Sequence, residues 1–225
     1  MNILICGATG RTGQLVTTLA LESGHHVTAY VRNELKARAV LPEHSNLRII
    51  RGELEDIPAL TRAARGAHAA ISTLGQDSLL KNMLRTDFMR RNLPPIVQAV
   101  SAAGVPRLVL LSSIGSGASY DSAPLAIKLA RHSVMRAIIG DKNAADTLLE
   151  SGDTQLSYVY AGMLTNSPSS LTPDLLAVHP GQKHLKIAPV PFIPREQVAR
   201  ALLKCATSSD ENEANQHWVV RAARG

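Results

Sequence analysis

The sequence predicts an α/β protein of one domain, with an open, doubly wound sheet of parallel strands. Three observations support this prediction. The 225 residues are 45% hydrophobic, which suffices for one sizeable core. The strand-like segments are continuous apolar runs, as strands covered on both faces require. The stretches between these segments are long enough for the crossover helices that parallel strands need.

Six strands are expected before about residue 160, and each is a short apolar run. They cover residues 3–6, 26–31, 47–50, 69–72, 107–111 and 156–159, and residues 218–220 predict a last strand. Two helices are predicted because their apolar side chains repeat on one side. These side chains are Leu15, Val16 and Leu19 within residues 14–21, and Val198, Ala201, Leu202 and Cys205 within residues 195–205.

The pattern changes in residues 162–194, which hold six of the twelve prolines of the chain. Because proline removes a backbone donor and fixes φ, regular structure should be sparse here. A long irregular stretch inside a compact domain is often a lid or a binding loop. We therefore expect that this segment is a small proline-rich lid over the substrate, within the single domain of residues 1–225. We prefer this interpretation to a surface loop that has no function.

Composition argues against several classes of protein. Aromatic residues make up only 3% of the chain, which counts against nucleic-acid modules that stack bases on aromatic side chains. The net charge of +6 suits an anionic partner, which need not be a polymer. The sequence contains no run of about 18 apolar residues, so no membrane span is predicted. The chain starts with a strand-like run in place of a secretory signal.

Cysteine and histidine usage predicts no metal site. Cys6 and Cys205 match neither a disulfide framework nor zinc-ligand spacing. We expect them to be buried, reduced thiols in a cytoplasmic protein. His179 and His184 have no cysteine or carboxylate at ligand spacing, and we interpret all eight histidines as structural or solvated.

The strongest local signal is the motif GATGRTG at residues 7–13, between the first strand and the first helix. Gly7 permits the tight turn, Gly10 lets the backbone approach a pyrophosphate, and Gly13 allows the helix to pack closely on the sheet. The N-terminus of the helix then offers free N–H groups to the phosphates. No Gly-Lys-Ser/Thr follows, so the motif is not a Walker loop. In this context it predicts a dinucleotide cofactor.

The end of the second strand indicates which dinucleotide is bound. In this type of fold, an acidic residue about 20 positions after the glycines holds the ribose 2′-OH of NAD. Here the strand leads into Arg32, which suits a 2′-phosphate through charge-assisted hydrogen bonds. Arg11 in the glycine loop is placed to contact the same phosphate, whereas the nearby Glu34 argues for NAD. We expect NADP(H) to be preferred over NAD(H).

Further motifs occur in the order seen in a known family: VRN at residues 31–33, GELED at 52–56, STLG at 72–75, AGVPRLVLLSS at 103–113 and AGMLTN at 161–166. With the glycine loop, they make almost the whole chain resemble the atypical short-chain dehydrogenase/reductases. The greatest similarity is to the NAD(P)H-binding, NmrA-like group, which includes flavin/biliverdin-IXβ reductases. The resemblance implies a Rossmann fold that binds NAD(P)H, and it is much less specific for the reaction.

The resemblance also implies which residues bind the cofactor, and all of them lie at carboxyl ends of predicted strands. They are Gly7, Thr9, Gly10, Arg11, Thr12 and Gly13 at the pyrophosphate; Arg32 at the adenosine phosphate; Glu53 and Leu54 at the adenine; Thr73, Leu74 and Gly75 beside the ribose; and Ser112 and Ser113 near the nicotinamide.

Catalysis is where the chain departs from the family pattern. Many members carry Tyr-x-x-x-Lys, in which the tyrosine transfers a proton. Lys142 falls at the lysine position, but Ile138 stands where the tyrosine belongs. Gly162 stands where flavin/biliverdin reductases have a histidine. The remaining candidate catalytic residues are Ser112, Ser113, Tyr120 and Lys142.

These residues favour a reaction that needs little proton chemistry. Our first hypothesis is an oxidoreductase in which NADPH reduces a flavin, a quinone or a similar small acceptor. Tyr120 follows the fifth strand and either enters the site or faces water. The alternative is a redox sensor of the NmrA type that binds the dinucleotide without turnover, and a sugar-nucleotide epimerase fits less well without the tyrosine. The sequence leaves open a monomer or a homodimer.

Overall fold

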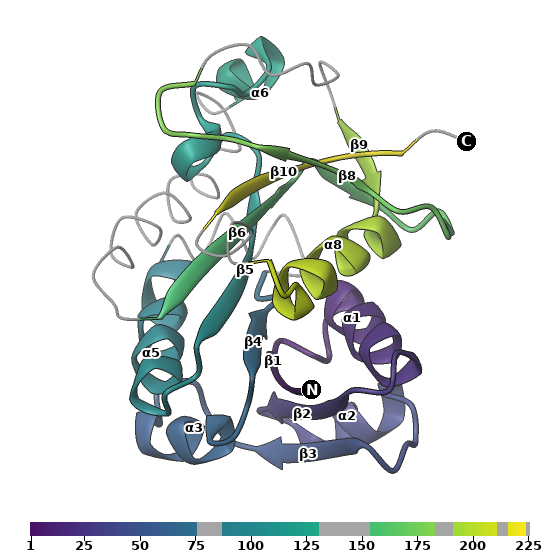
Figure 1. The fold of residues 1–225 in the computed structure, drawn as a ribbon, viewed down its shortest axis with the longest axis vertical. Coiled ribbons are helices and arrows are strands. Elements are labelled where there is room, and N and C mark those ends of the chain that lie inside the picture. Colours follow the sequence, from purple (N-terminus) through teal and green to yellow (C-terminus); the bar gives the residue numbers. More distant parts are fainter. Residues whose placement is uncertain (76–86, 131–153, 183–190, 211–215, 224–225) are drawn as a thin grey trace.

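The computed structural model describes residues 1–75, 87–130, 154–182, 191–210 and 216–223. In this part of the chain the main sheet has the strand order β3-β2-β1-β4-β5-β6-β10-β8. The strands are β1 (Asn2–Cys6), β2 (His26–Val31), β3 (Leu47–Arg51), β4 (Ala69–Ser72), β5 (Arg107–Ser113), β6 (Gln155–Ala161), β8 (Asp174–Ala177) and β10 (His217–Arg221). Neighbouring strands run parallel, except β10 and β8. The predicted doubly wound parallel sheet is therefore confirmed (Figure 1).

Helices cover both faces of this sheet (Figure 1). The described helices are α1 (Arg11–Glu22), α2 (Glu34–Val40), α3 (Ile57–Ala64), α5 (Phe88–Ala102), α6 (Leu125–Ala130), α8 (Arg195–Thr207) and the short 3₁₀ helix η1 (Gly117–Ser119). On one face α3 and α5 bury Leu60 and Ile96 in an apolar core. On the other face α1, α2 and α8 bury Val16, Ala37 and Leu202 in a second core. Both cores are mainly aliphatic, as the low aromatic content requires.

The carboxyl ends of the central strands meet at one edge of the sheet. Cys6, the last residue of β1, is in register with Tyr30 of β2 and with Ser72 of β4. Ser72 is in turn in register with Leu110 of β5. The strand order reverses at β1, since β2 lies on one side of it and β4 on the other. Open α/β sheets bind ligands at such a point, and the glycine loop begins there.

The proline-rich segment contains more regular structure than we expected. β7 (Met163–Thr165) and β9 (Phe192–Pro194) pair in parallel as a separate two-stranded sheet. β8 pairs antiparallel with β10 at the edge of the main sheet. These strands tolerate the neighbouring prolines because of where the prolines stand: Pro173 directly precedes β8, and Pro194 is the last residue of β9. At such ends a missing N–H does not interrupt a ladder of hydrogen bonds. The expectation of sparse strands here was therefore wrong for these three short segments.

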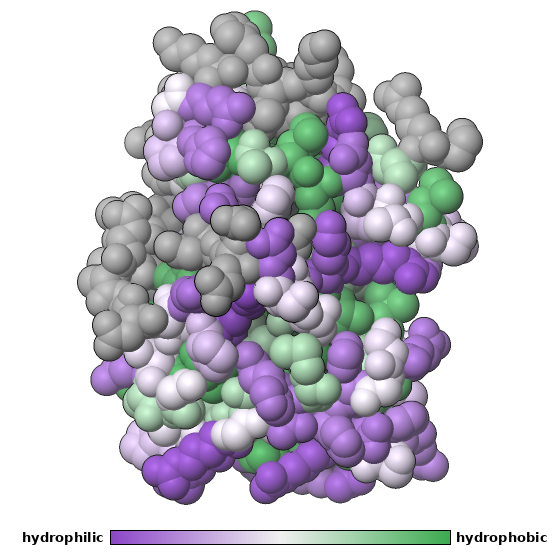
Figure 2. Space-filling view, viewed as in Figure 1, coloured by the Kyte–Doolittle hydropathy of each residue, from purple (hydrophilic) through white to green (hydrophobic). Residues whose placement is uncertain are grey.

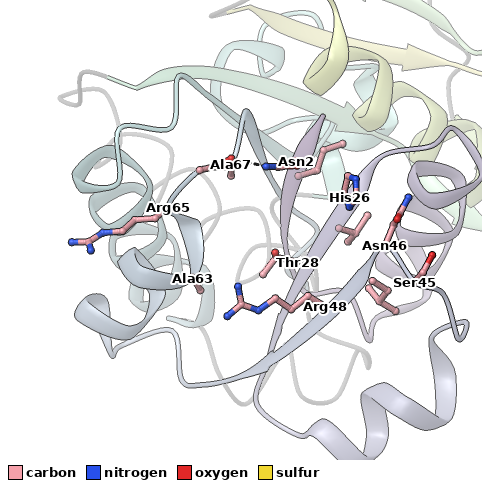
Figure 3. Close-up of a pocket in the computed structure, with 13 residues that line it drawn as sticks. Asn2, His26, Thr28, Ser45, Asn46, Arg48, Ala63, Arg65 and Ala67 are labelled. Atoms are coloured by element: carbon pink, nitrogen blue, oxygen red, sulfur yellow. Dashed lines mark hydrogen bonds between the residues drawn. The ribbon is translucent and has the colours of Figure 1, made fainter.

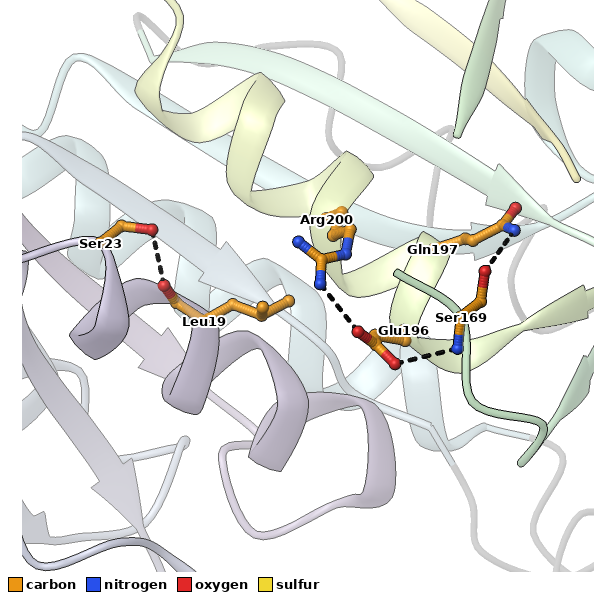
Figure 4. Close-up of polar contacts among 6 residues, drawn as sticks. All are labelled: Leu19, Ser23, Ser169, Glu196, Gln197 and Arg200. Carbon is orange, nitrogen blue, oxygen red and sulfur yellow. Dashed lines mark hydrogen bonds and ion pairs between the residues drawn. The ribbon is translucent and has the colours of Figure 1, made fainter. Parts of the chain in front are cut away.

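The segment after β7 is tied to the start of α8 (Figure 4). The Glu196 carboxylate accepts a hydrogen bond from the N–H of Ser169 at 3.1 Å and pairs with Arg200 at 2.8 Å. The buried Gln197 donates to Oγ of Ser169 at 2.8 Å and accepts from the N–H of Ala223 at 2.9 Å. Two adjacent side chains of α8 thus fix one end of the proline-rich segment.

Glu196 should make the stability of the protein depend on pH. The hydrogen bonds from Arg200 and from the N–H of Ser169 hold the pKa of Glu196 below its usual range, against an opposing effect of burial. The stabilisation is therefore complete above the unfolded pKa of about 4.3 and is lost as the pH falls through the lower, folded pKa. E196Q should lower the free energy of unfolding by about 1 kcal/mol at pH 7 and by less near pH 3. Urea denaturation at the two pH values measures this difference.

The control for this prediction is E34Q, which breaks an exposed ion pair of the same spacing. Glu34 and Arg38 are joined at 2.7 Å on the surface of α2. Loss of such a pair should cost about 0.4 kcal/mol. An E196Q effect that is equal at both pH values would contradict the role assigned to the Glu196 carboxylate.

The face in Figure 2 mixes hydrophilic residues with smaller hydrophobic areas. Among the described residues, no helix combines the length and the apolar character needed to cross a bilayer. Two large apolar side chains are exposed on neighbouring strands. Met163 of β7 and Phe192 of β9 are in register, and their exposed fractions are 50% and 57%.

Candidate functional site

Two glycines of the loop are required by the protein's own packing. Gly7 has a φ of +89°, which side-chain-bearing residues rarely adopt, and a Cβ there would lie 2.8 Å from Oγ1 of Thr73. A Cβ on Gly13 would lie 2.2 Å from the carbonyl oxygen of Gly7 and 2.8 Å from Cα of Ala8. Oγ1 of Thr73 donates to the Gly7 carbonyl at 3.1 Å and fixes the turn. These contacts hold the start of α1 against the ends of β1 and β4.

Gly10 is different, because the protein itself gives little reason for a glycine. Its φ of −77° suits any residue, and the one close contact of a Cβ would be with the Gly7 carbonyl oxygen at 3.3 Å, which is tight but far less severe than the contacts at Gly13. Gly10 also caps α1 without a side chain, so the first N–H groups of the helix receive no side-chain cap. The first turn contains no acidic residue. An open backbone surface with free donors at a helix N-terminus fits the pyrophosphate of a dinucleotide.

The ends of β2 and β3 form the part of the site assigned to adenosine. Arg32 directly follows β2, is exposed, and has no ion-pair partner among the described residues. Glu34 is engaged with Arg38, through contacts of 2.7 and 3.0 Å. The hydroxyl of Tyr30 donates to the carbonyl of Glu53 at 3.1 Å and fixes the turn after β3. Leu54 is buried in the core, so it would face an adenine mainly through its backbone.

The end of β5 carries a network of buried serines. Oγ of Ser112 lies 2.9 Å from Oγ of Ser116, and Oγ of Ser116 donates to the carbonyl of Ser113 at 2.8 Å. Oγ of Ser119 bridges the N–H of Gly115 and the carbonyl of Ser116. Ser112 is buried and Ser113 half-buried, so Ser113 is the more accessible of the two predicted residues. The network makes the turn after β5 rigid.

Tyr120 ends this turn and is half-buried. Nζ of Lys128 lies 5.8 Å from the centroid of its ring and donates to the carbonyl of Asp121 at 2.7 Å. An ammonium group at this distance is attracted to the ring, so Lys128 helps to hold Tyr120 in place. Lys142 and Ile138, which bear on the Tyr-x-x-x-Lys comparison, lie outside the described residues. The role of Tyr120 in catalysis therefore stays a prediction.

The sequence reasoning missed one polar contact near the glycine loop. Nη1 of Arg195, the first residue of α8, donates a short hydrogen bond to Oδ1 of Asn166. The two residues are 29 positions apart, and the pairing of β7 with β9 brings them together. The signal in the sequence was the arginine at the start of a predicted helix.

Neither cysteine takes part in this chemistry. Cys6 and Cys205 are both buried, as expected, and no disulfide joins them. Burial raises the pKa of the Cys6 thiol to about 12, so the thiol stays neutral although it directly precedes the glycine loop. Within the described ranges, no three histidine, cysteine, aspartate or glutamate residues are grouped so as to hold a metal ion.

A surface cavity of about 340 Å³ lies at the opposite edge of the sheet (Figure 3). Its walls come from the beginnings of β1, β2 and β3 and from the end of α3, and they include His26, Arg48 and Arg65. The amino ends of parallel strands are not where open α/β sheets bind ligands. This cavity is therefore separate from the site at the glycine loop.

Comparisons with known proteins agree with this geometry. The chain is 26% identical to the oxidoreductase aflX of Aspergillus parasiticus over 231 residues. The aligned region covers 97% of this chain and 82% of that protein. Two of the solved structures that share the fold show the extent of the similarity. A short-chain dehydrogenase/reductase from Veillonella parvula, in complex with NADP, has a TM-score of 0.76 and 22% identity, and the match covers 98% of this chain and 94% of that one. ChuY, an anaerobillin reductase from Escherichia coli O157:H7, has a TM-score of 0.74 and 20% identity, with 100% and 98% coverage.

A family model described as NAD(P)H-binding matches residues 7–209. This range begins at the first glycine of the loop and ends just after α8, so it includes every part of the site described above. The chain therefore belongs to the NAD(P)H-binding family.

Proposed function

We propose that this protein is a reductase that uses NADPH to reduce a small, flat acceptor such as a flavin or a quinone. The single observation that carries the proposal is Gly10. It leaves an uncapped helix N-terminus and an open backbone surface, for which the packing of the protein gives little other reason. The relationship to an oxidoreductase over nearly the whole chain supports an enzyme.

Each part of the site has a task in this proposal. The loop of residues 7–13 binds the pyrophosphate, and Thr73 keeps the loop in its bound shape through the Gly7 carbonyl. Glu53 and Leu54 contact the adenine, and Leu74 and Gly75 run beside the ribose. When bound, the reduced nicotinamide supplies a hydride, while the protein orients the reactants and excludes water. Ser113 at the rigid end of β5 orients the nicotinamide side of the site.

Two observations support a preference for NADPH. Arg32 is exposed at the end of β2 without an ion-pair partner among the described residues, so its guanidinium is available to a 2′-phosphate. Glu34 would favour NAD by accepting a hydrogen bond from the ribose, but its carboxylate is bound by Arg38. Directly after β2, the guanidinium of Arg32 is therefore available to a phosphate, while the carboxylate of Glu34 is engaged.

The acceptor is expected at the other end, under the proline-rich segment. Met163 and Phe192 form an exposed apolar pair within this segment, which suits a flat, partly apolar molecule. A flavin or a quinone accepts a hydride without a dedicated protein acid, in keeping with Ile138 at the position of the family tyrosine. That same isoleucine favours the second candidate function, a sensor that binds NADP(H) without turnover.

Titrations of the purified protein with NADPH and with NADH, followed by cofactor fluorescence, test the proposal. FMN or a quinone is then added to the tighter complex. Tighter binding of NADPH, followed by loss of the nicotinamide absorbance, is the expected result. Binding without loss for flavins, quinones and aldehydes would replace the reductase by the sensor. Absence of binding for both cofactors would overturn both candidate functions.

A further inference from the structure

Two arginines begin neighbouring helices beside the glycine loop. Arg11 is the first residue of α1, and Arg195 is the first residue of α8. The two helices pack against each other, and Figure 4 shows α8 running beside α1. Burial, and after it the positive charge of Arg11, lowers the pKa of Arg195.

Arg195 is held in place by the segment that follows β7. Its Nη1 donates to Oδ1 of Asn166. Pro194, directly before Arg195, is in register with Thr165, directly before Asn166. The pairing of β7 with β9 thus fixes the donor and the acceptor side by side. A guanidinium that is already oriented loses less conformational entropy when it binds an anion.

Neither arginine has an anionic partner among the described residues. Glu196, next to Arg195 in the sequence, is bound by Arg200 and by the N–H of Ser169 (Figure 4). The first turn of α1 holds no acidic residue. Two like charges held close together repel each other, and an anion between them removes this repulsion. Phosphate oxygens are well suited, because a guanidinium can bind two of them at once.

We propose that Arg195 is a further cofactor-binding residue, which contacts the pyrophosphate together with Arg11 of the glycine loop. This inference rests on the proposed function, because the pyrophosphate is that of the bound dinucleotide. Asn166 is a positioning residue that orients Arg195. Since Asn166 directly follows β7, binding of the cofactor also stabilises the beginning of the segment that is expected to cover the acceptor.

Calorimetric titration of the whole chain with four ligands tests the inference. NADPH, NADH and ADP-ribose all contain the pyrophosphate, and ADP-ribose lacks the nicotinamide. 2′-AMP carries a 2′-phosphate and no pyrophosphate. R195Q should weaken the first three ligands equally, by about tenfold, and leave 2′-AMP unchanged. R195K keeps the charge without the planar fork and should lose less than R195Q.

Two further variants separate this role from a structural one. N166A should weaken the same three ligands by a few-fold, and it should add little to R195Q, because it acts through Arg195. K204Q removes one positive charge from the last turn of the same helix and should leave all four affinities unchanged. Thermal unfolding without ligand should be alike for the wild type, R195K and K204Q.

The outcomes that overturn the inference are distinct. An unchanged affinity of R195Q for ADP-ribose removes Arg195 from the pyrophosphate site. A loss confined to NADPH and 2′-AMP assigns it to the 2′-phosphate, and a raised KM for the acceptor with unchanged cofactor affinity assigns it to the acceptor. The proposed function fails separately, if the wild type binds ADP-ribose and never oxidises NADPH. A wild type that binds none of the four ligands overturns both.

Discussion

Replacing Gly13 by alanine is expected to lower the free energy of unfolding by about 3 kcal/mol. The added Cβ would lie 2.2 Å from the Gly7 carbonyl oxygen and 2.8 Å from Cα of Ala8. Both contacts are with backbone, so no side-chain rotation relieves them. Either α1 moves away from the sheet or the turn at Gly7 opens, and the second change also releases the hydrogen bond from Thr73. Urea denaturation without cofactor measures the loss, and the affinity for NADPH should fall with it.

Gly10→Ala is the matched control, because it adds the same methyl group three residues earlier. Its Cβ would meet only one backbone oxygen, at 3.3 Å. The free energy of unfolding should fall by about 1 kcal/mol or less, since alanine is a poorer N-cap than glycine. Affinity for NADPH should nevertheless fall tenfold or more, because the methyl group occupies the approach of the pyrophosphate to the N–H groups, and each such charged hydrogen bond is worth about 1.5–3 kcal/mol. Equal stability losses for the two variants, with an unchanged affinity of Gly10→Ala for NADPH, would show that Gly10 serves packing alone.

The order of the sheet follows from local sequence because each buried parallel strand is a continuous apolar run. Residues 26–31 and 69–72 were predicted as strands and form β2 and β4 with the same bounds. β5 and β6 continue two residues beyond the predicted ends. Ser112 and Ser113 interrupt the apolar pattern, yet they remain in register with Tyr160 and Ala161. A ladder of backbone hydrogen bonds extends a strand regardless of side-chain polarity, so the apolar run underestimates its length.

Two elements depend on contacts that no local pattern contains. β8 exists because β10 presents an open edge to the proline-rich segment. α5 runs through Pro94 and Pro95, which argue against the interior of a helix. Its buried side chains, Leu93 and Ile96 among them, pack into the core beside α3, and this burial outweighs the hydrogen bonds that the prolines remove.

The candidate site likewise has a part that the local sequence predicts and a part that depends on contacts between distant segments. The spacing of Gly7, Gly10 and Gly13 is local, so the loop and its place after the first strand could be predicted. The contact between Asn166 and Arg195 depends on the pairing of β7 with β9, which the prolines conceal. The serines behind Ser112 were also missed, because the glycines in residues 115–119 (GSGAS) are typical of a flexible loop, whereas Ser116 and Ser119 are fully buried.

Arg32→Ala is expected to weaken NADPH about a hundredfold and to change the affinity for NADH by less than about twofold. The guanidinium would lose its charge-assisted hydrogen bonds to the 2′-phosphate, and NADH has no group at that position. The fold should be unaffected, because Arg32 is exposed and the next residue, Asn33, caps α2 through its own side chain. Fluorescence titration with both cofactors measures the two affinities. In the wild type, a higher ionic strength should reduce the difference between the affinity for NADPH and the affinity for NADH.

Arg48→Ala is the control for this change, since it removes the same side chain and charge from the opposite edge of the sheet. Arg48 is exposed and lines the cavity at the beginnings of β1, β2 and β3. A general loss of positive charge would weaken NADPH alike in the two variants, whereas a specific contact affects Arg32→Ala alone. Equal losses of NADPH and NADH in Arg32→Ala would assign Arg32 to the structure of the site and would return the choice of cofactor to Glu34. Arg38→Ala would then favour NADH, because it releases the Glu34 carboxylate toward the ribose.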